Sequence, residues 1–280
     1  MIAPQTWMIT GGNRGLGRAL TLAALEAGHE VVATVRGEHT LPEHERLTVH
    51  TLDVRDRQAA RETVEAVAER LGRLDVLVNN AGYGLIGAIE EVSEDEARLI
   101  LDTNLLGPLW LSQSAIPIMR RQGAGHIVQI STIGAVGTMP TLGLYNTSKW
   151  GLEAFSEALA AEVRQFGIRV SLIEPGSLDT DWAGGSMRFS SPNSAYDDLR
   201  TELFGTAEVP WPQGEPMGGT SPADAATAIL AHIASQDDHR LRVLIGNDAP
   251  EQVRAALELR HQDYAQDPRF PTPSVEMQTE

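Results

Sequence analysis

The 280-residue sequence contains no cysteine. Disulfides, a thiolate nucleophile and a thiolate-bound metal site are therefore excluded. The sequence also lacks the run of about eighteen apolar residues that a transmembrane helix requires. Its start, where the strand-like segment Thr6–Thr10 follows almost at once, has neither the basic region nor the apolar stretch of a signal peptide. We therefore expect a cytoplasmic protein.

Positive charge is also scarce. The chain has 22 lysine and arginine residues against 38 aspartate and glutamate residues, which gives a formal net charge of −16. Nucleic acids and anionic membranes are bound by positive surfaces. The charge balance therefore argues against both as partners, and solubility is a sufficient reason for the acidity.

Short apolar segments of strand length alternate with segments of helical period. The expected strands are Thr6–Thr10, Glu30–Val35, Leu47–Leu52, Val76–Asn79, His126–Ser131, Arg169–Ile173 and Leu241–Ile245. The expected helices are Gly15–Ala27, Arg57–Leu71, Glu94–Arg121, Tyr145–Phe166 and Pro222–Ser235. This alternation predicts an α/β fold, a single Rossmann-type, doubly wound domain with a parallel sheet of about seven strands and helices on both faces.

Two regions interrupt this alternation. Residues 181–220 are rich in Gly, Pro and Ser without a clean period, and we interpret them as a lid segment within a domain that spans residues 1–250. Residues 251–280 are expected to form a C-terminal helix and a poorly packed tail, because the last residues contain proline and little apolar periodicity.

A glycine-rich loop separates the first strand from the first helix, with the spacing Gly11-x-x-x-Gly15-x-Gly17. Glycine allows a tight turn and a close backbone approach, and a helix N-terminus attracts anions. The pattern alone could be a structural turn, but after a first strand in a series of βα units it indicates dinucleotide binding. The expected cofactor contacts in the loop are Gly11, Asn13, Arg14, Gly15, Leu16 and Gly17.

The end of the second strand indicates which dinucleotide is bound. An acidic residue there usually holds the 2′-hydroxyl of NAD, but this position is Val35. Arg36 follows, and Arg14 lies in the glycine loop. Two guanidinium groups suit a 2′-phosphate, so the sequence favours NADP(H) over NAD(H).

Tyr145 and Lys149 are four residues apart and lie on one face of a predicted helix. A nearby ammonium favours the phenolate and would lower the tyrosine pKa from its usual value near 10. Tyr145 could then act as a general acid or base on a substrate oxygen. A pair at this spacing also occurs by chance in many helices.

Six segments together make the chain resemble the short-chain dehydrogenase/reductase family over about residues 5–250. They are Thr10-Gly-Gly-Asn-Arg-Gly-Leu-Gly17, Asp53-Val54, Asn79-Asn-Ala-Gly82, Asn104 in LDTNLLG, Tyr145-x-x-x-Lys149 and Pro175-Gly-Ser-Leu-Asp-Thr180. Their order and approximate spacing match the family.

The resemblance implies catalytic roles for four residues. Tyr145 would exchange the proton with the substrate oxygen, Lys149 would hold the nicotinamide ribose, and Asn104 would kink its helix and position a water. The family has a serine thirteen positions before the tyrosine, where this chain has Thr132. Ser131 is one place too early, and neighbours on a strand face opposite sides, so Thr132 is the expected hydroxyl.

The resemblance also implies further cofactor contacts. Asp53 would accept from the adenine amino group beside Val54, and Leu178 and Thr180 would fix the nicotinamide carboxamide. The remaining expected contacts are Arg36, Asn80, Ala81, Gly82, Pro175 and Gly176.

Aromatic residues cluster in the lid segment. The expected apolar lining comprises Trp182, Phe189, Tyr196, Phe204 and Trp211, with Met139, Leu142, Tyr83 and Leu85 completing it. Such a lining suits a hydrophobic small molecule, although a satellite core under a long loop is the alternative.

We therefore expect an NADP(H)-dependent oxidoreductase of the carbonyl reductase or alcohol dehydrogenase type. It would act on a ketone, an aldehyde or a secondary alcohol, and we expect no metal. The alternatives are a non-catalytic NADP(H) sensor and a cofactor-independent lyase of the halohydrin dehalogenase kind. Family resemblance also implies a homodimer or homotetramer with an isologous interface.

Overall fold

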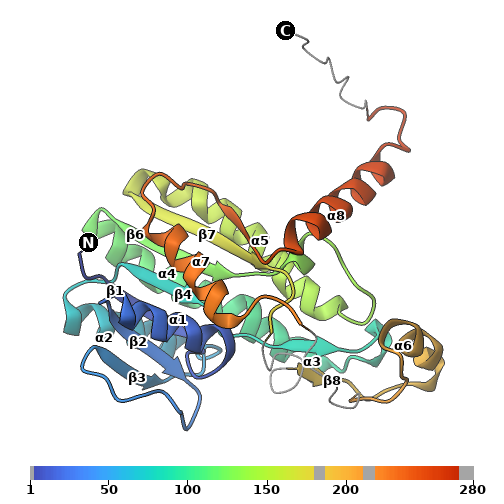
Figure 1. The fold of residues 1–280 in the computed structure, drawn as a ribbon, viewed down its shortest axis with the longest axis horizontal. Coiled ribbons are helices and arrows are strands. Elements are labelled where there is room, and N and C mark those ends of the chain that lie inside the picture. Colours follow the sequence, from blue (N-terminus) through green and yellow to red (C-terminus); the bar gives the residue numbers. More distant parts are fainter. Residues whose placement is uncertain (1–2, 180–186, 211–217, 271–280) are drawn as a thin grey trace.

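The computed structural model describes residues 3–179, 187–210 and 218–270. Its main feature is a seven-stranded sheet in the order β3-β2-β1-β4-β6-β7-β9, in which all pairs are parallel (Figure 1). The strands are β1 (Thr6–Thr10), β2 (Glu30–Val35), β3 (Leu47–Thr51), β4 (Val76–Asn79), β6 (Gly125–Ile130), β7 (Ile168–Pro175) and β9 (Arg242–Ile245). The predicted sheet is confirmed, and the carboxyl ends of its strands share one edge.

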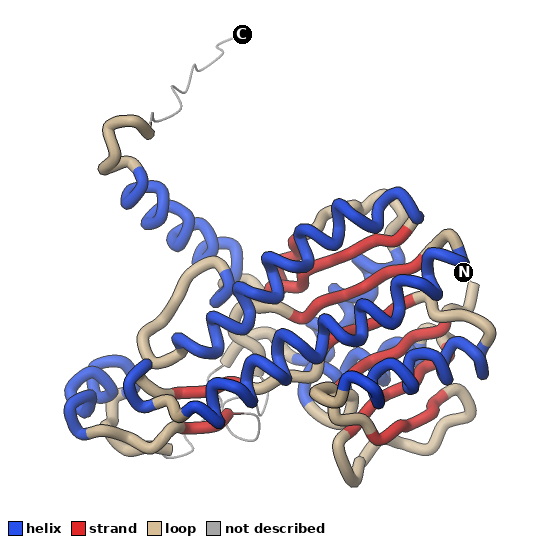
Figure 2. Tube along the Cα trace, turned by 180° about the vertical axis from the view of Figure 1, so that it is seen from behind, coloured by secondary structure: helices blue, strands red, loops and turns tan. Residues whose placement is uncertain are grey.

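Helices cover both faces of this sheet. They are α1 (Gly15–Glu26), α2 (Arg57–Leu71), α3 (Glu94–Leu101), α4 (Gly107–Gln122), α5 (Gly143–Val163) and α7 (Pro222–Ala234). One apolar core joins α1 and α7 to the sheet, and a second joins α2, α4 and α5 to the opposite face. Figure 2 shows this second helix layer lying across the strands. The domain is therefore doubly wound, as predicted.

The predicted helix Glu94–Arg121 is interrupted. A π-helical segment, η2 (Asp102–Leu106), separates α3 from α4, so the prediction of one continuous helix is wrong. A π-turn widens the hydrogen-bond ring by one residue and shifts the facing of the following side chains. Asn104 lies in this segment and is fully buried. The predicted N-cap of α3 is confirmed, since Ser93 and Glu96 form a reciprocal capping box.

Three elements inside or beside the lid segment were not predicted. β5 (Gly84–Ile86) and β8 (Met187–Phe189) form a separate two-stranded parallel sheet, and α6 (Asp197–Phe204) follows. The buried Arg200 side chain holds this region by an ion pair to Glu91 at 2.6 Å. Four short 3₁₀ turns complete the described elements: η1 (Ile89–Glu91), η3 (Ile133–Ala135), η4 (Arg164–Phe166) and η5 (Ser194–Tyr196).

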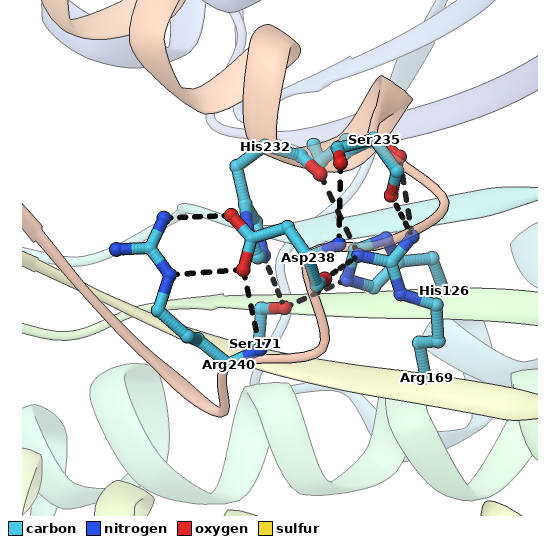
Figure 3. Close-up of polar contacts among 8 residues, drawn as sticks. His126, Arg169, Ser171, His232, Ser235, Asp238 and Arg240 are labelled. Carbon is cyan, nitrogen blue, oxygen red and sulfur yellow. Dashed lines mark hydrogen bonds and ion pairs between the residues drawn. The ribbon is translucent and has the colours of Figure 1, made fainter.

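The C-terminal end of α7 is anchored to the sheet by a buried polar cluster (Figure 3). Arg169 on β7 donates to the carbonyl oxygens of Ser235 at 3.0 Å and Asp238 at 2.7 Å. Ser171 lies 2.8 Å from Nε2 of both His126 and His232. The guanidinium thus satisfies carbonyls that the helix end and the following turn leave without intrahelical partners.

A final helix, α8 (Ala249–Tyr264), extends away from the sheet (Figure 1). Ala249 is its one buried residue. Beyond it, Phe270 stacks on Tyr264 with ring centroids 5.6 Å apart. The predicted C-terminal helix is thus present. Within the described part of the chain, no helix combines the length and the apolar character needed to cross a membrane.

Candidate active site

A cavity of about 1320 Å³ opens at the carboxyl edge of the main sheet. It is the place where a doubly wound sheet binds its ligand. The predicted site residues that line it are Gly11, Asn13, Arg14, Gly15, Leu16, Gly17, Arg36, Val54, Asn80, Ala81, Gly82, Thr132, Tyr145, Lys149, Pro175, Gly176 and Leu178. Among the described residues, Asp53 and Asn104 lie outside this lining, and Thr180 is outside the described residues.

The glycine loop requires glycine at two positions. Gly11 has a φ of 66°, which disfavours other residues, and a Cβ on Gly17 would come 2.3 Å from the Gly11 carbonyl oxygen. The Asn80 amide then fixes the loop by donating to the Thr10 carbonyl at 2.8 Å and the Gly11 carbonyl at 3.2 Å. The end of β4 therefore holds the loop against the start of α1.

The N-terminus of α1 suits an anion. Its N-cap residue is Arg14, whose side chain has no acceptor for the first-turn N–H groups, and that turn has no acidic residue. These N–H groups and the helix dipole attract negative charge. The loop therefore fits the phosphates of a dinucleotide.

The loop after β2 lies at the same end of the cavity. Val35 is buried and Arg36 is exposed along the lining. Asn13 accepts from the Thr40 amide at 2.8 Å and donates to the Glu38 carbonyl at 3.2 Å, so its side chain braces this loop. Glu38 also lines the cavity and was not predicted. Glu38 lies three residues beyond the end of β2, whereas the sequence pattern for NAD binding considers only the residue at the strand end.

Asp53 is paired with its near neighbour Arg55 in this structure. Its carboxylate accepts two hydrogen bonds from Arg55 Nε, at 2.9 and 3.0 Å. These hydrogen bonds hold the pKa of Asp53 below its ordinary value. Val54 contacts the cavity beside it. In this structure, therefore, only the second member of the pair reaches the cavity lining.

Tyr145, Lys149 and Thr132 meet at the inner part of the cavity. Tyr145 and Lys149 lie one turn apart on α5, and both are buried. The Tyr145 hydroxyl lies beside the Thr132 hydroxyl, close enough for the latter to lower the tyrosine pKa in part. Lys149 Nζ donates to the Ile130 carbonyl at 2.7 Å. The structure thus brings a phenol, a hydroxyl and an ammonium together at the end of β6.

The pKa values of this group differ from the expectation for Tyr145. Burial raises the Tyr145 pKa to about 12, against a smaller opposing effect of the Thr132 hydroxyl. Burial lowers the Lys149 pKa to about 8, and the Glu153 carboxylate opposes that shift. The predicted lowering of the tyrosine pKa is therefore wrong for this structure, because desolvation of the phenolate outweighs the effect of the Thr132 hydroxyl.

Asn104 supports the site from behind. Its side chain accepts from the Tyr83 amide at 3.1 Å and donates to the Tyr83 carbonyl at 2.9 Å and to Ser148 Oγ at 3.2 Å. A Cβ on Gly82 would lie 3.1 Å from Asn104 Oδ1 and 3.8 Å from Lys149 Nζ. Asn104 thus fixes the loop that faces Lys149, from the π-helical segment.

Ser131 and Thr132 are separated as the strand geometry predicts. Thr132 lies beside Tyr145, whereas Ser131 lies beside the Glu153 carboxyl group, whose pKa is raised by burial against an opposing effect of the Ser131 hydroxyl. The two groups are close, yet Ser131 Oγ has no hydrogen bond of full geometry within the described chain.

The lid aromatics were placed wrongly by the sequence. Within the described chain, Phe189, Tyr196 and Phe204 lie outside the cavity lining, while Trp182 and Trp211 fall outside the described residues. Tyr196 instead donates to Glu90 at 2.7 Å. The described part of the segment is held by polar contacts, among them the buried ion pair of Arg200 with Glu91. Of the other predicted lining residues, Tyr83, Met139 and Leu142 do line the cavity, while Leu85 is buried in a separate apolar cluster.

Helix α8 supplies one wall of the cavity, and no pattern in the sequence predicts this contact. Its lining residues are Gln252, Ala255, Ala256, Leu259 and Arg260. Arg260 donates to the Val136 carbonyl, and its guanidinium lies 4.7 Å from the centre of the Trp150 ring. A periodic pattern near residue 255 predicts a helix. It does not predict that this helix contacts the loop at residue 136.

Comparison with known proteins agrees with this geometry. The family model described as short chain dehydrogenase matches residues 5–188. A 3-ketodihydrosphingosine reductase from Bacteroides thetaiotaomicron is 38% identical over 234 residues, which cover 84% of this chain and 85% of that protein.

Two solved structures are also similar. A short-chain dehydrogenase from Streptomyces avermitilis has a TM-score of 0.84 at 33% identity, covering 94% of this chain and 96% of that chain. A metagenomic short-chain oxidoreductase in complex with NADP has a TM-score of 0.67 at 28% identity, covering 86% and 96%. The family model matches most of the chain, and the structure has the predicted fold. The chain therefore belongs to the short-chain dehydrogenase family of oxidoreductases.

Proposed function

We propose that the protein is an NADP(H)-dependent oxidoreductase that interconverts a ketone or aldehyde with the corresponding alcohol. The observation that carries this proposal is the meeting of Tyr145, Thr132 and Lys149 in the same cavity as the glycine loop. The cavity therefore offers a proton donor at one part and a phosphate-binding helix end at another.

NADP(H), when bound, would supply or accept the hydride. The chain's own residues would handle the oxygen and the proton. The Tyr145 and Thr132 hydroxyls would both hydrogen-bond the substrate oxygen, which stabilises negative charge that develops there. Because its pKa lies near 12, Tyr145 is protonated at neutral pH and can donate its proton to that oxygen during reduction.

The preference for NADP(H) rests on charge at one end of the cavity. Arg14 and Arg36 both line it, and Val35 stands where an acid would favour NAD(H). The similar oxidoreductase in complex with NADP supports the same choice. The Asn13 side chain would keep the loop that carries Arg36 in place.

The proposed substrate is hydrophobic. Tyr83, Met139, Leu142 and Leu259 contribute apolar surface to the cavity around Tyr145. The similarity to a protein named 3-ketodihydrosphingosine reductase is in keeping with a ketone substrate.

The test is to mix the purified protein with NADPH or NADH and a panel of hydrophobic ketones and aldehydes, and to follow the nicotinamide absorbance. We expect turnover with NADPH, a preference over NADH, and a loss of at least about a hundredfold in kcat for Tyr145→Phe. Tight NADPH binding without turnover on any substrate would support a sensor instead. Absence of binding to either dinucleotide would contradict the proposal.

A further inference from the structure

Behind the proposed active site, three carboxylates surround one guanidinium. Arg242 on β9 contacts Glu153 Oε2 at 3.1 Å and Glu157 Oε2 at 2.9 Å, both from α5. It also contacts Glu174 Oε1 at 3.3 Å, from β7. Glu174 is 1% exposed, whereas the side chain of Glu157 is 63% exposed. The cluster therefore runs from the solvent into the interior of the domain.

Glu153 connects this cluster to Lys149. The two residues lie one turn apart on α5, and both are buried. They face consecutive residues of the strand end: Lys149 Nζ donates to the Ile130 carbonyl, while the Glu153 carboxyl group lies beside the Ser131 hydroxyl. The other titratable side chain of the site is Tyr145 on α5, and burial raises its pKa to about 12. Among the described residues, Glu153 supplies the negative charge that opposes the lowering of the Lys149 pKa by burial.

Glu157 is exposed, so the charges that must compensate one another inside the domain are those of Lys149, Arg242, Glu153 and Glu174. They are two positive and two negative charges, and a buried charge without a partner is costly. Burial raises the pKa of Glu153, and the Ser131 hydroxyl and the Arg242 guanidinium oppose that shift. Burial also raises the pKa of Glu174 to about 7, with the neighbouring Glu153 carboxylate as the next contribution. Glu153 therefore has Arg242 as its ion-pair partner and Lys149 one turn away on α5.

We propose that Glu153, held by Arg242, is a positioning residue that keeps the buried Lys149 side chain protonated. Ser131 lies beside the Glu153 carboxyl group and has no direct place in the chemistry. The effect of this arrangement on turnover rests on the proposed function. The charge coupling between Glu153 and Lys149 is independent of the proposed function.

The sequence allows a direct test, because Lys149 is the only lysine in the chain. Selective ¹³C labelling of lysine gives one ε-carbon signal, whose chemical shift follows the protonation of that amine. We expect a midpoint near pH 8 in the free wild-type protein. In Glu153→Gln the midpoint should fall by about half a pH unit or more, because removing a nearby carboxylate disfavours the ammonium.

Glu157→Gln is the matched control. It removes a carboxylate from the same helix and the same guanidinium, but one that is exposed to solvent. We expect its midpoint to equal that of the wild type, and Glu153→Asp, which keeps the charge, to restore most of the shift. Equal midpoints in Glu153→Gln, Glu157→Gln and the wild type would overturn the proposal.

A measurement on the wild type covers the case in which Glu153→Gln does not fold. A ¹³C-glutamate titration should show a Glu153 carboxyl signal with a step at the Lys149 midpoint, since coupled groups report each other's ionisation. A Glu153 signal without that step would contradict the proposal.

Activity supplies a separate readout. If the protein reduces carbonyl compounds with NADPH, the alkaline limb of its kcat profile should move to lower pH in Glu153→Gln and not in Glu157→Gln. An unmoved limb would contradict the proposal. If no carbonyl compound is turned over, the proposed function fails, and the lysine titration still decides whether the coupling exists.

Discussion

At the end of β6, Thr132 and Ser131 are adjacent in sequence and lie in different surroundings. Thr132 meets Tyr145 in the cavity, and Ser131 meets Glu153 behind it. Both partners belong to α5, and they lie eight residues apart, so the two hydroxyls meet the helix about two turns from each other. One serine and one threonine therefore have separate surroundings although their side-chain chemistry is similar.

This separation leads to a prediction for the two hydroxyls. Thr132→Ala should lower kcat for carbonyl reduction about a hundredfold, since it removes a donor from the developing oxyanion. Ser131→Ala should leave kcat within about threefold of the wild type. Steady-state kinetics of both variants with one ketone make the comparison. An undiminished kcat in Thr132→Ala together with a crippled Ser131→Ala would reverse the two assignments.

Arg36 allows a second prediction at the residue scale. Arg36→Ser should raise KM for NADPH about tenfold or more, because a hydrogen bond to a charged group is lost. KM for NADH should change little, since NADH has no 2′-phosphate, and it therefore serves as the internal control. An equal change for both cofactors would mean that Arg36 does not read the 2′ position.

At the scale of elements, the end of α7 depends on a chain of hydrogen bonds through the sheet (Figure 3). His232 Nδ1 lies 2.8 Å from Asp238 Oδ2, and the carboxylate accepts a hydrogen bond from it. Ser171 Oγ lies between Nε2 of His232 and Nε2 of His126, at 2.8 Å from each. His126 Nδ1 has no hydrogen-bond partner among the described residues.

A pH dependence of stability follows from His126. Burial, and then the charge of Arg169, hold the His126 pKa well below the ordinary 6.5. Below pH 6.5 the unfolded state therefore binds a proton that the folded state refuses, so stability is lost as pH falls. The expected slope from this residue is about 1.4 kcal/mol per pH unit. Urea unfolding at several pH values should show a shallower slope in His126→Gln, and an unchanged slope would argue against this assignment.

Helix α8 is the other element whose position matters for the site. Arg260→Met removes the hydrogen bond to Val136 and the contact with the Trp150 ring. The cation–π contact alone is worth about 1 kcal/mol. We expect KM for a bulky hydrophobic substrate to rise several-fold with little change in kcat. Arg254→Met on the same helix, at an exposed position outside the cavity lining, is the control. Equal KM values in the two variants would show that this wall does not contact substrate.

At the scale of the whole molecule, two apolar cores on opposite faces hold one sheet, and all the chemistry lies along one of its edges. The glycine loop, the loop after β2 and the end of β6 come from three distant parts of the chain. They meet because parallel strands end at the same edge. The π-helical segment adds Asn104 to that edge from the helix layer.

Assembly is a prediction that belongs to this scale. The segments 94–121 and 145–166 are the expected faces of a homodimer or homotetramer. Light scattering during size exclusion should give a mass of two or four times 30.3 kDa. A charged substitution on an exposed residue of α5 outside the cavity lining, such as Ala158→Glu, should then reduce that mass, and a monomeric wild type would contradict the expectation.

The sequence by itself determined the strands, most of the helices, the glycine loop and the positions of Tyr145, Lys149 and Thr132. These features follow from local rules: the period of apolar residues, the conformations open to glycine, and the alternation of side chains along a strand. Each is set by residues within a few positions of one another.

Only the tertiary structure decided what those residues contact. The pairing of Asp53 with Arg55, the wall formed by α8 and the carboxylate cluster around Arg242 join side chains by their place in space. The direction of the Tyr145 pKa shift is decided in the same way, because desolvation depends on every element that covers the phenol. The period of apolar residues in the sequence does not indicate which elements will bury the phenol. The charge state of the site was therefore set by packing, while its residues could be located from the sequence.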